Sequence, residues 1–353
     1  MQQRHASTGN KKQRAGLRIS LTLALGLAAA AAATNALACA SCGCTLSKDW
    51  DAQGQTTVPG LSADLSYTYI NQNRQLYGSK TASPGLINNL YANGQEDELS
   101  TKTATTTAAI NYNGDAWGVS VQIPYLDRTH ATNGVTANGG ADLGANYTTS
   151  SDSGIGDVRI IGRYSGLCED KTSTGLIFGL KLPTGSTNAT FNAGAGAGQA
   201  LDPGLQLGTG STDIILGGYT SGAIGSYGWF VQGTVQRAVT TKNDMLGNYY
   251  RPGDAYSLNA GIRYAGFGAR VSPMLQLNFV RRENDRGPDI AADPLTGALV
   301  SGGQLLYLSP GVTVRVGGGI SVYGFVQVPI YQYVNSLQLV PKYTATLGVR
   351  QSF

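Results

Sequence analysis

Beyond residue 38 the chain lacks any apolar run of 18 or more residues, which excludes a membrane-spanning helix there. It also has little charge, 13% of its 353 residues, and only 7 Phe. His130 is the one histidine beyond residue 38, which leaves few groups for acid–base chemistry. Abundant instead are Gly, with 49 residues, and Tyr, with 19, in a chain where polar and apolar residues interleave. This composition is typical of an all-β protein.

Residues 1–38 are expected to be a cleaved secretory signal peptide. The apolar run from Ile19 to Ala33 is followed by Ala36-Leu37-Ala38, which has the A-x-A form of a cleavage site. Five bases precede that run: Arg4, Lys11, Lys12, Arg14 and Arg18. Without them the remaining chain has 20 basic and 21 acidic residues, a net charge of −1. The basic character therefore belongs to the leader, and nucleic-acid binding loses its support.

Alternating polar and apolar residues recur from Leu61 to the end of the chain and predict about twelve strands. We expect them at 61–70, 97–112, 115–128, 154–167, 172–184, 210–221, 225–239, 252–266, 268–282, 302–315, 318–333 and 339–353. Short and long links alternate between them, apart from the short last link at 334–338. A membrane barrel has this alternation, because its periplasmic rim carries short turns and its exterior rim carries long loops.

We therefore predict a single antiparallel transmembrane β-barrel over residues 61–353, located in the bacterial outer membrane with both termini on the periplasmic side. On the strand at 252–266, Tyr256, Leu258 and Ile262 are expected to face lipid. Aromatic residues near strand ends would form the interfacial belts: Trp117, Tyr227, Trp229, Tyr256, Tyr264 and Tyr343.

Two features fit this barrel less well. The strand at 97–112 is nearly all Thr and Ala, which makes a weak lipid-facing surface. Pro273, Pro310 and Pro329 fall inside strands, where each removes a hydrogen-bond donor, so we expect bulges or strand ends there. Residues 39–60 show no clear strand and are expected to be a Cys-rich periplasmic segment or a plug.

The last seven residues resemble the C-terminal signal that the outer-membrane assembly machinery recognises. Phe353 ends the chain, and Val349 and Leu347 stand at alternate positions before it. Gln351 departs from the aromatic or apolar residue usual at its position. The resemblance implies that the assembly machinery is a partner of this chain.

Four short motifs together resemble a family of outer-membrane transporter barrels named for a meta-cleavage pathway of phenol degradation. They are Ile123-Pro124-Tyr125-Leu126-Asp127-Arg128, Gly154-Ile155-Gly156-Asp157-Val158, Leu180-Lys181-Leu182-Pro183-Thr184-Gly185 and Gly208-Thr209-Gly210-Ser211-Thr212-Asp213. Their order and spacing cover roughly residues 115–220. The resemblance implies a barrel and small-molecule transport, without naming a solute.

Strand alternation points a set of basic residues into the lumen. Seven bases are expected there, namely Arg159, Arg163, Lys181, Arg263, Arg270, Arg315 and Arg350. Three acids oppose them, Asp64, Asp157 and Asp213, which leaves an excess of +4. A low-dielectric wall focuses such a field, so the lumen would bind or pass anions. Alternatively, these residues form ion-pair ladders inside a narrow, filled barrel.

Four cysteines are expected on the periplasmic side. Cys39, Cys42 and Cys44 open the mature chain, and Cys168 lies in a predicted periplasmic turn. In an oxidising compartment an even count favours two disulfides, one of which would tie the leading segment to the barrel rim. A soft-metal site and lipidation of Cys39 are the alternatives.

Other chemistry has little support. A Ser/His hydrolase would have to use His130, at the outer end of its strand, and no hydrolase motif surrounds it. The run Gly194–Gly198 lacks the strand–turn–helix context of a phosphate loop. The acids at 96–98 and at Asp285, Asp289 and Asp293 are expected on solvated loops, where bridging to lipopolysaccharide through divalent cations is the alternative.

The leading hypothesis is passive transport or binding of small solutes with a modest preference for anions, with no enzymatic activity and no cofactor. The alternative is a barrel anchor whose Cys-rich segment engages a periplasmic redox or metal-handling protein. Expected partners are outer-membrane lipid and lipopolysaccharide, and no nucleic acid. Conduction by the purified barrel would favour the first hypothesis, and loss of a partner on Cys→Ser substitution would favour the second.

Overall fold

A computed structural model describes residues 59–353, except 135–143, 145, 170–171, 246–247, 268–269, 289 and the side chains of 166–169. The chain divides into two units, Met1–Asn35 and Ala36–Phe353, and the description below concerns the second. The predicted signal peptide, Cys39, Cys42 and Cys44 lie outside the described residues. None of the helices in the described part has the length and apolarity to cross a bilayer.

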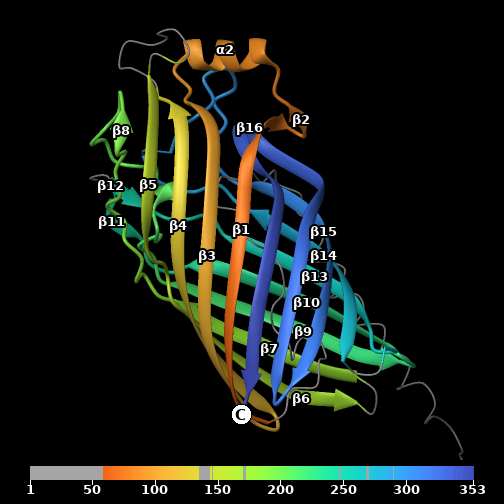
Figure 1. Ribbon diagram of the computed structural model, residues 1–353. Helices are drawn as coiled ribbons and strands as arrows, with labels where there is room; N and C mark the ends of the chain where they lie inside the picture. The colour runs from red at the N-terminus through yellow and green to blue at the C-terminus, as the bar shows by residue number, and fades with distance from the viewer. Residues whose placement is uncertain are drawn as a thin grey trace, which may run out of the picture. The chain divides into compact units, whose positions relative to one another are not determined.

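Eleven strands close into one antiparallel ring, in the order β1-β16-β15-β14-β13-β10-β9-β7-β6-β4-β3 and back to β1. Their bounds are β1 Gly60–Gly78, β3 Asp97–Asn113, β4 Trp117–Asn133, β6 Arg159–Glu169, β7 Thr172–Lys181, β9 Asp213–Ile224, β10 Tyr227–Ala238, β13 Ala255–Tyr264, β14 Val271–Arg282, β15 Gly303–Gly317 and β16 Ile320–Ser352. Figure 1 shows β1, β3 and β4 side by side, with the C-terminus at one end and α2 at the other. The predicted barrel is confirmed.

The ring holds twelve strand positions, because β16 folds back on itself. Residues 320–334 of β16 pair with β15, and residues 334–352 pair with β1. Ser336 has a positive φ of 52° between the two halves. The Ser352 amide donates to the Gly319 carbonyl at 3.0 Å, so the halves lie antiparallel. The prediction of about twelve strands is therefore correct.

The short and long connections alternate as the sequence predicts. Strands joined by short turns meet at one rim, which we assign to the periplasm. The other rim carries the long connections and their elements: β2 Lys80–Thr81, α2 Pro84–Ala92, β8 Ala193–Gly194, η2 Pro203–Leu205, β11 Lys242–Met245 and β12 Asn248–Tyr250. Helix α2 begins at Ser83, whose hydroxyl accepts from the Leu86 amide at 3.3 Å, and Pro84 fits the first turn. Leu90 and Tyr91 are the buried residues of this helix.

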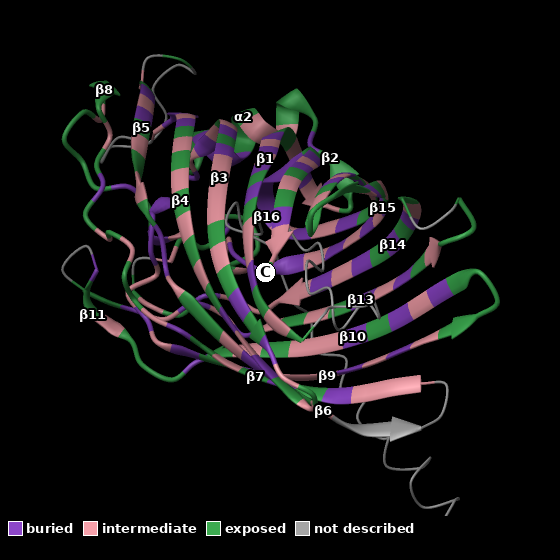
Figure 2. Ribbon diagram, turned by 60° about the horizontal axis from the view of Figure 1, so that its bottom comes forward, coloured by how far each residue is buried: buried purple, intermediate pink, exposed green. Residues whose placement is uncertain are grey.

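Burial alternates along the strands, as the colours of Figure 2 show on several of them, because successive side chains point to opposite faces of the wall. On β10, Phe230 and Gln232 point inward and are buried, whereas Val231 and Val235 are exposed on the outer surface. A broad exposed apolar surface of this kind faces lipid. Trp117 and Tyr227 lie in ring contact with Tyr112 and Tyr264 at the periplasmic strand ends, with centroid distances of 5.2 and 5.0 Å. These rings stand where an interfacial belt is expected.

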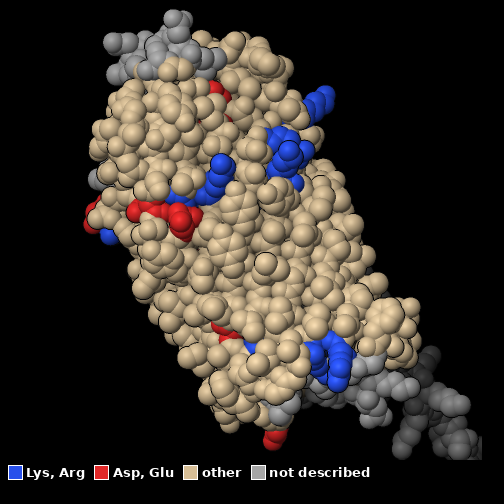
Figure 3. All heavy atoms as spheres, in the orientation of Figure 1, with Lys and Arg blue, Asp and Glu red and all other residues tan. Residues whose placement is uncertain are grey.

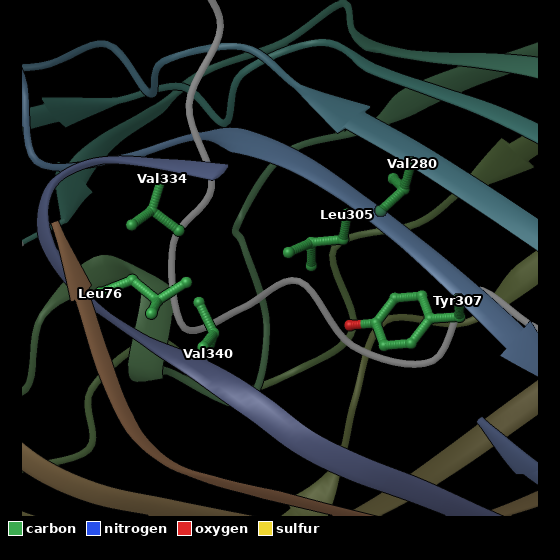
Figure 4. Packing of buried hydrophobic residues seen from close by; sticks show 6 residues of the cluster. All are labelled: Leu76, Val280, Leu305, Tyr307, Val334 and Val340. Atoms are coloured by element: carbon green, nitrogen blue, oxygen red, sulfur yellow. The ribbon is translucent and has the colours of Figure 1, made fainter. Parts of the chain in front are cut away.

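Apolar residues also gather on the inner face of the extracellular half. Figure 4 shows Leu76 of β1, Val280 of β14, Leu305 and Tyr307 of β15, and Val334 and Val340 of β16 packed together. A second cluster in the periplasmic half joins β10, β14 and β16 through Phe230, Met274, Tyr323 and Phe325. The two clusters fix the inner side chains of neighbouring strands against one another.

The structure corrects several predicted boundaries. The chain at 129–153 is not all loop, because β4 runs to Asn133 and β5 (Tyr147–Ile155) pairs with its outer half. Strand β1 likewise continues to Gly78. The extensions of β4 and β5 are mostly polar on both faces, and in β1 the apolar Leu76 points inward, so the period-2 pattern that marks lipid-facing strands ends before the strands do.

The three strand prolines behave differently. Pro329 lies beside a bulge in the β15–β16 pairing, as predicted. Pro273 lies just beyond the last β13 partner of β14, so it marks the end of that ladder. Pro310 interrupts the pairing with β16 between Leu308 and Gly311 without changing the register, so the expected bulge is absent from that position.

Candidate channel lumen

Arginines from four strands gather at the periplasmic end of the lumen. Arg163 of β6, Arg263 of β13, Arg315 of β15 and Arg350 of β16 each stand a few residues from a short turn or from the chain end. Arg163 donates to Asn113 Oδ1 at 2.8 Å, and Arg350 donates to Ser62 Oγ at 2.9 Å. Arg263 and Arg315 lie close enough for their charges to repel. We call these four residues the periplasmic arginines.

One inward-facing acid accompanies them among the described strand residues of this end. Asp64 of β1 lies directly opposite Arg350 of β16 in the strand register. The Tyr323 hydroxyl donates to both oxygens of Asp64, at 3.0 and 3.1 Å. The carboxylate is therefore held by a hydroxyl and a neighbouring base, and the four arginines give this end a positive excess. Tyr323 was not predicted as a lumen residue, because aromatic residues on a barrel strand are usually assigned to the lipid face.

Lys181 is not an open lumen charge but the centre of a buried network. Its ammonium lies 3.0 Å from Asp157 Oδ2 and 3.2 Å from Asp213 Oδ1, and the Lys181 residue is only 3% exposed. Thr209 and Ser211 contribute hydroxyls to the same network. We call these five residues the Lys181 cluster. Because each charge has an opposite partner and hydrogen bonds, the cluster can be buried without a large penalty.

The four motifs of the sequence resemblance meet at this cluster. Asp157 Oδ2 accepts from the Thr209 amide at 3.0 Å, and Asp157 Oδ1 accepts from the Gly185 amide at 3.1 Å. The Gly156 amide donates to the Pro124 carbonyl at 2.8 Å. Gly185 and Gly208 pass so closely that a Cβ on Gly208 would lie 2.5 Å from the Gly185 carbonyl oxygen. The motifs therefore build one structural junction.

This junction lies where the barrel wall changes partners. Strand β4 pairs with β6 through residues 117–122 and with β5 through residues 125–133, and residues 156–158 bridge the two ladders. Strand β7 ends at Lys181 and β9 begins at Asp213. Arg128 donates to the carbonyls of Gly204 and Gln206, at 3.3 and 3.1 Å. The junction thus fastens the long connection 182–212 to the wall.

The remaining predicted lumen bases have different positions. Arg159 faces inward at the start of β6, within electrostatic reach of Asp157 and Asp213. Arg270 is exposed in the turn before β14, and its carbonyl accepts from the Arg315 amide at 2.7 Å. Cys168 lies at the periplasmic end of β6, opposite Ser173 of β7.

His130 is packed inside the wall. It is buried, its Nδ1 lies 2.8 Å from Thr101 Oγ1, and its ring lies 6.2 Å from that of Phe191. The hydrogen bond of this ring therefore goes to a threonine hydroxyl of the neighbouring strand. No group of three or more His, Cys, Asp or Glu is arranged for a metal ion within the described residues.

Acidic residues at the extracellular mouth accept hydrogen bonds from the connections there. Asp97 accepts from Asn133 Nδ2 at 2.9 Å, and Asp285 accepts from the Tyr250 hydroxyl at 3.1 Å and the Gly253 amide at 2.8 Å. Glu96 forms a side-chain hydrogen bond with Asp202, from a connection far away in the sequence. Desolvation and the neighbouring charges of Asp202 and Glu98 raise the pKa of Glu96 well above its ordinary value. Sequence analysis did not foresee the Glu96–Asp202 contact.

Comparison with known proteins decides the family. The model of the family described as "Putative MetA-pathway of phenol degradation" matches residues 51–327. The chain belongs to this family. Comparison with curated proteins finds no match for this family member.

Solved structures resemble this family member in fold. The COG4313 outer membrane channel from Pseudomonas putida F1 has a TM-score of 0.60 and 13% identity, covering 84% of this chain and 97% of that chain. The translocator domain of the autotransporter NalP from Neisseria meningitidis has a TM-score of 0.47 and 10% identity, covering 86% and 91%. The transport unit of AIDA-I from Escherichia coli has a TM-score of 0.46 and 13% identity, covering 83% and 90%. The family member therefore has the fold of an outer-membrane barrel.

Proposed function

We propose that this protein is a passive channel for small solutes, and that the periplasmic arginines give it a preference for anions. The observation that carries the proposal is the convergence of Arg163, Arg263, Arg315 and Arg350 from four strands on one end of the lumen. The fold of an outer-membrane channel supports the transport part. Field lines from charges inside a low-dielectric wall concentrate in the lumen and raise the local concentration of anions.

Arg263 and Arg315 are the most informative residues to change. Both are more accessible than Arg163 and Arg350, which are buried. Replacing them should therefore alter the field of the lumen with little loss of packing. One unit charge acting over roughly 10 Å of water changes the local anion concentration about twofold.

The test is the reversal potential of purified protein in planar bilayers under a salt gradient. The double variant Arg263→Gln/Arg315→Gln should lower the anion preference about fourfold, as two such charges are removed. Arg237→Gln, on the outer surface of β10, is the matched control and should leave the potential unchanged. An unaltered reversal potential in the double variant would contradict the anion preference, and absence of conductance in the folded wild type would contradict the channel.

A further inference from the structure

The outer surface of the barrel distributes its charges unevenly. Outward-facing charged residues on the described barrel strands stand in the extracellular halves of these strands: Lys102 of β3, Asp127 of β4, Arg237 of β10, Arg281 of β14 and Lys342 of β16. In the periplasmic half, the described outward-facing strand positions are uncharged. Figure 3 shows a wide uncharged band on one face, with basic and acidic groups above it and others below it. Four bases against one acid favour an anionic partner in the outer leaflet.

Strand β3 forms a shallow groove below this basic rim. Its outward residues Ala104, Thr106 and Ala108 are small, and larger side chains flank them on both sides. In register, Tyr69, Tyr67 and Leu65 of β1 lie on one side of β3. On the other side, Asp127, Tyr125 and Ile123 of β4 lie opposite Ala104, Thr106 and Ala108. The Thr- and Ala-rich strand that fitted poorly as a lipid face is thus the floor of a groove.

Two hollows lie along this groove. The apolar one, of about 350 Å³, is lined mainly by Leu65, Ala108, Ile110, Val121 and Ile123. The polar one, of about 570 Å³, lies at the extracellular end and includes Lys102, Thr129, Ser151 and Asn192. Lys102 makes no hydrogen bond or ion pair with any described residue, so its ammonium is available to a ligand.

The length of the groove matches one leaflet. From Lys102 to Ala108 the strand advances about 20 Å, and its tilt reduces this to roughly 15 Å of membrane depth. Half of a bilayer core is also about 15 Å. A fatty acyl chain that begins beside Lys102 would therefore end at Ala108, where the apolar hollow begins, and the hollow continues past Ile110 toward the periplasmic strand ends.

We propose that this groove binds a phosphorylated glycolipid of the outer leaflet, lipopolysaccharide. A phosphate lies at Lys102, hydroxyl groups of the polar hollow face the sugar, and one acyl chain lies over Ala104, Thr106 and Ala108. Lys342 stands two strands away, about 10 Å from Lys102, and faces the same headgroup. The extracellular position of the bases selects the lipid of that leaflet over the phospholipid of the inner one.

The test compares lipid retention by intact mature barrels incubated with purified lipopolysaccharide lipid A or with phosphatidylglycerol, measured by native mass spectrometry. Lys102→Gln should reduce lipid A retention about fivefold, the effect of one base near an anionic lipid surface. Ala108→Phe should reduce it separately, by filling the apolar hollow. Arg270→Gln is the matched control, because Arg270 is an exposed base in a periplasmic turn, at the opposite end of the barrel from the basic rim.

Each outcome decides the proposal. Reduced lipid A retention in both groove variants, with the control unchanged, supports it. Equal retention in Lys102→Gln and wild type overturns it, and so does equal binding of phosphatidylglycerol and lipid A. Circular dichroism and heat-dependent electrophoretic migration confirm that each variant is a folded barrel. The readout is lipid mass, so it is independent of conductance and of the proposed channel function.

Discussion

The two ends of the barrel place their charges in opposite ways. At the periplasmic end the bases lie inside, as the four periplasmic arginines, while the described outer strand surface is uncharged. At the extracellular end bases stand on the outer surface, and the inner acids hold connections through Asp97, Asp157 and Asp285. Inward-facing charged residues thus have two roles in one barrel. At the periplasmic end they give the lumen a positive field, and at the extracellular end they hold the long connections to the wall.

The largest expected effect on stability comes from removing the lysine of the Lys181 cluster, which holds the connection 182–212 to the wall. Lys181→Met should destabilise the barrel by about 3–5 kcal/mol, because it leaves Asp157 and Asp213 buried without their counter-charge. The measurement is the midpoint of reversible urea unfolding in detergent. The connection 182–212 should also become more sensitive to protease.

The double variant Lys181→Met/Asp213→Asn is the control for this prediction. It removes one of the two uncompensated charges and should recover part of the lost stability. A stability loss below about 1 kcal/mol in Lys181→Met would mean that the cluster is hydrated like a surface ion pair. The extracellular end would then not differ from an ordinary charged rim.

This junction also shows how far sequence could lead. The motifs that build it were recognised, and the strand alternation placed Lys181, Asp157 and Asp213 on the inner face. Alternation gives only the face of the wall, however, and not the depth or the partner. The contacts of Asp157 with Gly185 and Thr209 depend on how residues 182–212 return to the wall, and no periodic pattern encodes that return.

Other features of the structure could not be predicted from the sequence, for related reasons. Helix α2 has nine residues, too few to show a clear 3.6-residue period. The strand extensions around Asn133 and Tyr147 are polar on both faces because they stand beyond the bilayer. The twelve strands were predictable, because successive residues of a membrane strand face lipid and lumen in turn, and apolar and polar residues therefore alternate along it.

The second prediction sharpens the periplasmic side of the comparison. Asp64→Asn removes the inward acid that faces Arg350, so the lumen should become more anion-selective. We expect about a twofold rise in anion preference, since one unit charge acts over roughly 10 Å of water. Reversal potentials under a salt gradient measure it.

Tyr323→Phe serves as the comparison for Asp64→Asn. It removes a hydrogen bond to the carboxylate but leaves the negative charge in place. Its reversal potential should therefore stay close to that of the wild type. A decrease in anion preference in Asp64→Asn would show that the ion preference of the periplasmic end does not follow the net formal charge of its residues.

The third prediction concerns pH at the extracellular mouth. The pKa of Glu96 is raised by desolvation and by the charge of Asp202, and desolvation also raises the pKa of Asp202. The carboxyl groups of the folded protein thus bind protons more tightly than those of the unfolded chain do. The contact is favoured at low pH and weakens as pH rises from the ordinary carboxyl range, about 4, through the raised pKa of the pair.

Hydrogen exchange of the amides near Asp202 should therefore accelerate with pH beyond the intrinsic chemical rate. Glu96→Gln should reduce this additional dependence, and Glu96→Gln/Glu98→Gln should abolish it, because desolvation and the charge of Asp202 also raise the pKa of Glu98, to about 7. Asp244→Asn is the matched control, since Asp244 is exposed and the hydrogen bond from Lys242 lowers its pKa instead. An additional pH dependence that persists in Glu96→Gln/Glu98→Gln would assign it to another group.

The smallest effect is expected on the outer surface of the extracellular end. Arg237 reaches Asp254 at 3.7 Å, but its side chain is 61% exposed, so the pair is screened by solvent. Arg237→Gln should change the free energy of unfolding by less than about 1 kcal/mol and leave the reversal potential unchanged. The same urea unfolding and bilayer measurements test both parts. If this variant matched Lys181→Met in stability loss, the distinction between charges that fasten the wall and charges that face the membrane would fail. A small effect here, beside a large one at Lys181, would establish that burial and full pairing decide which extracellular charges hold the barrel together.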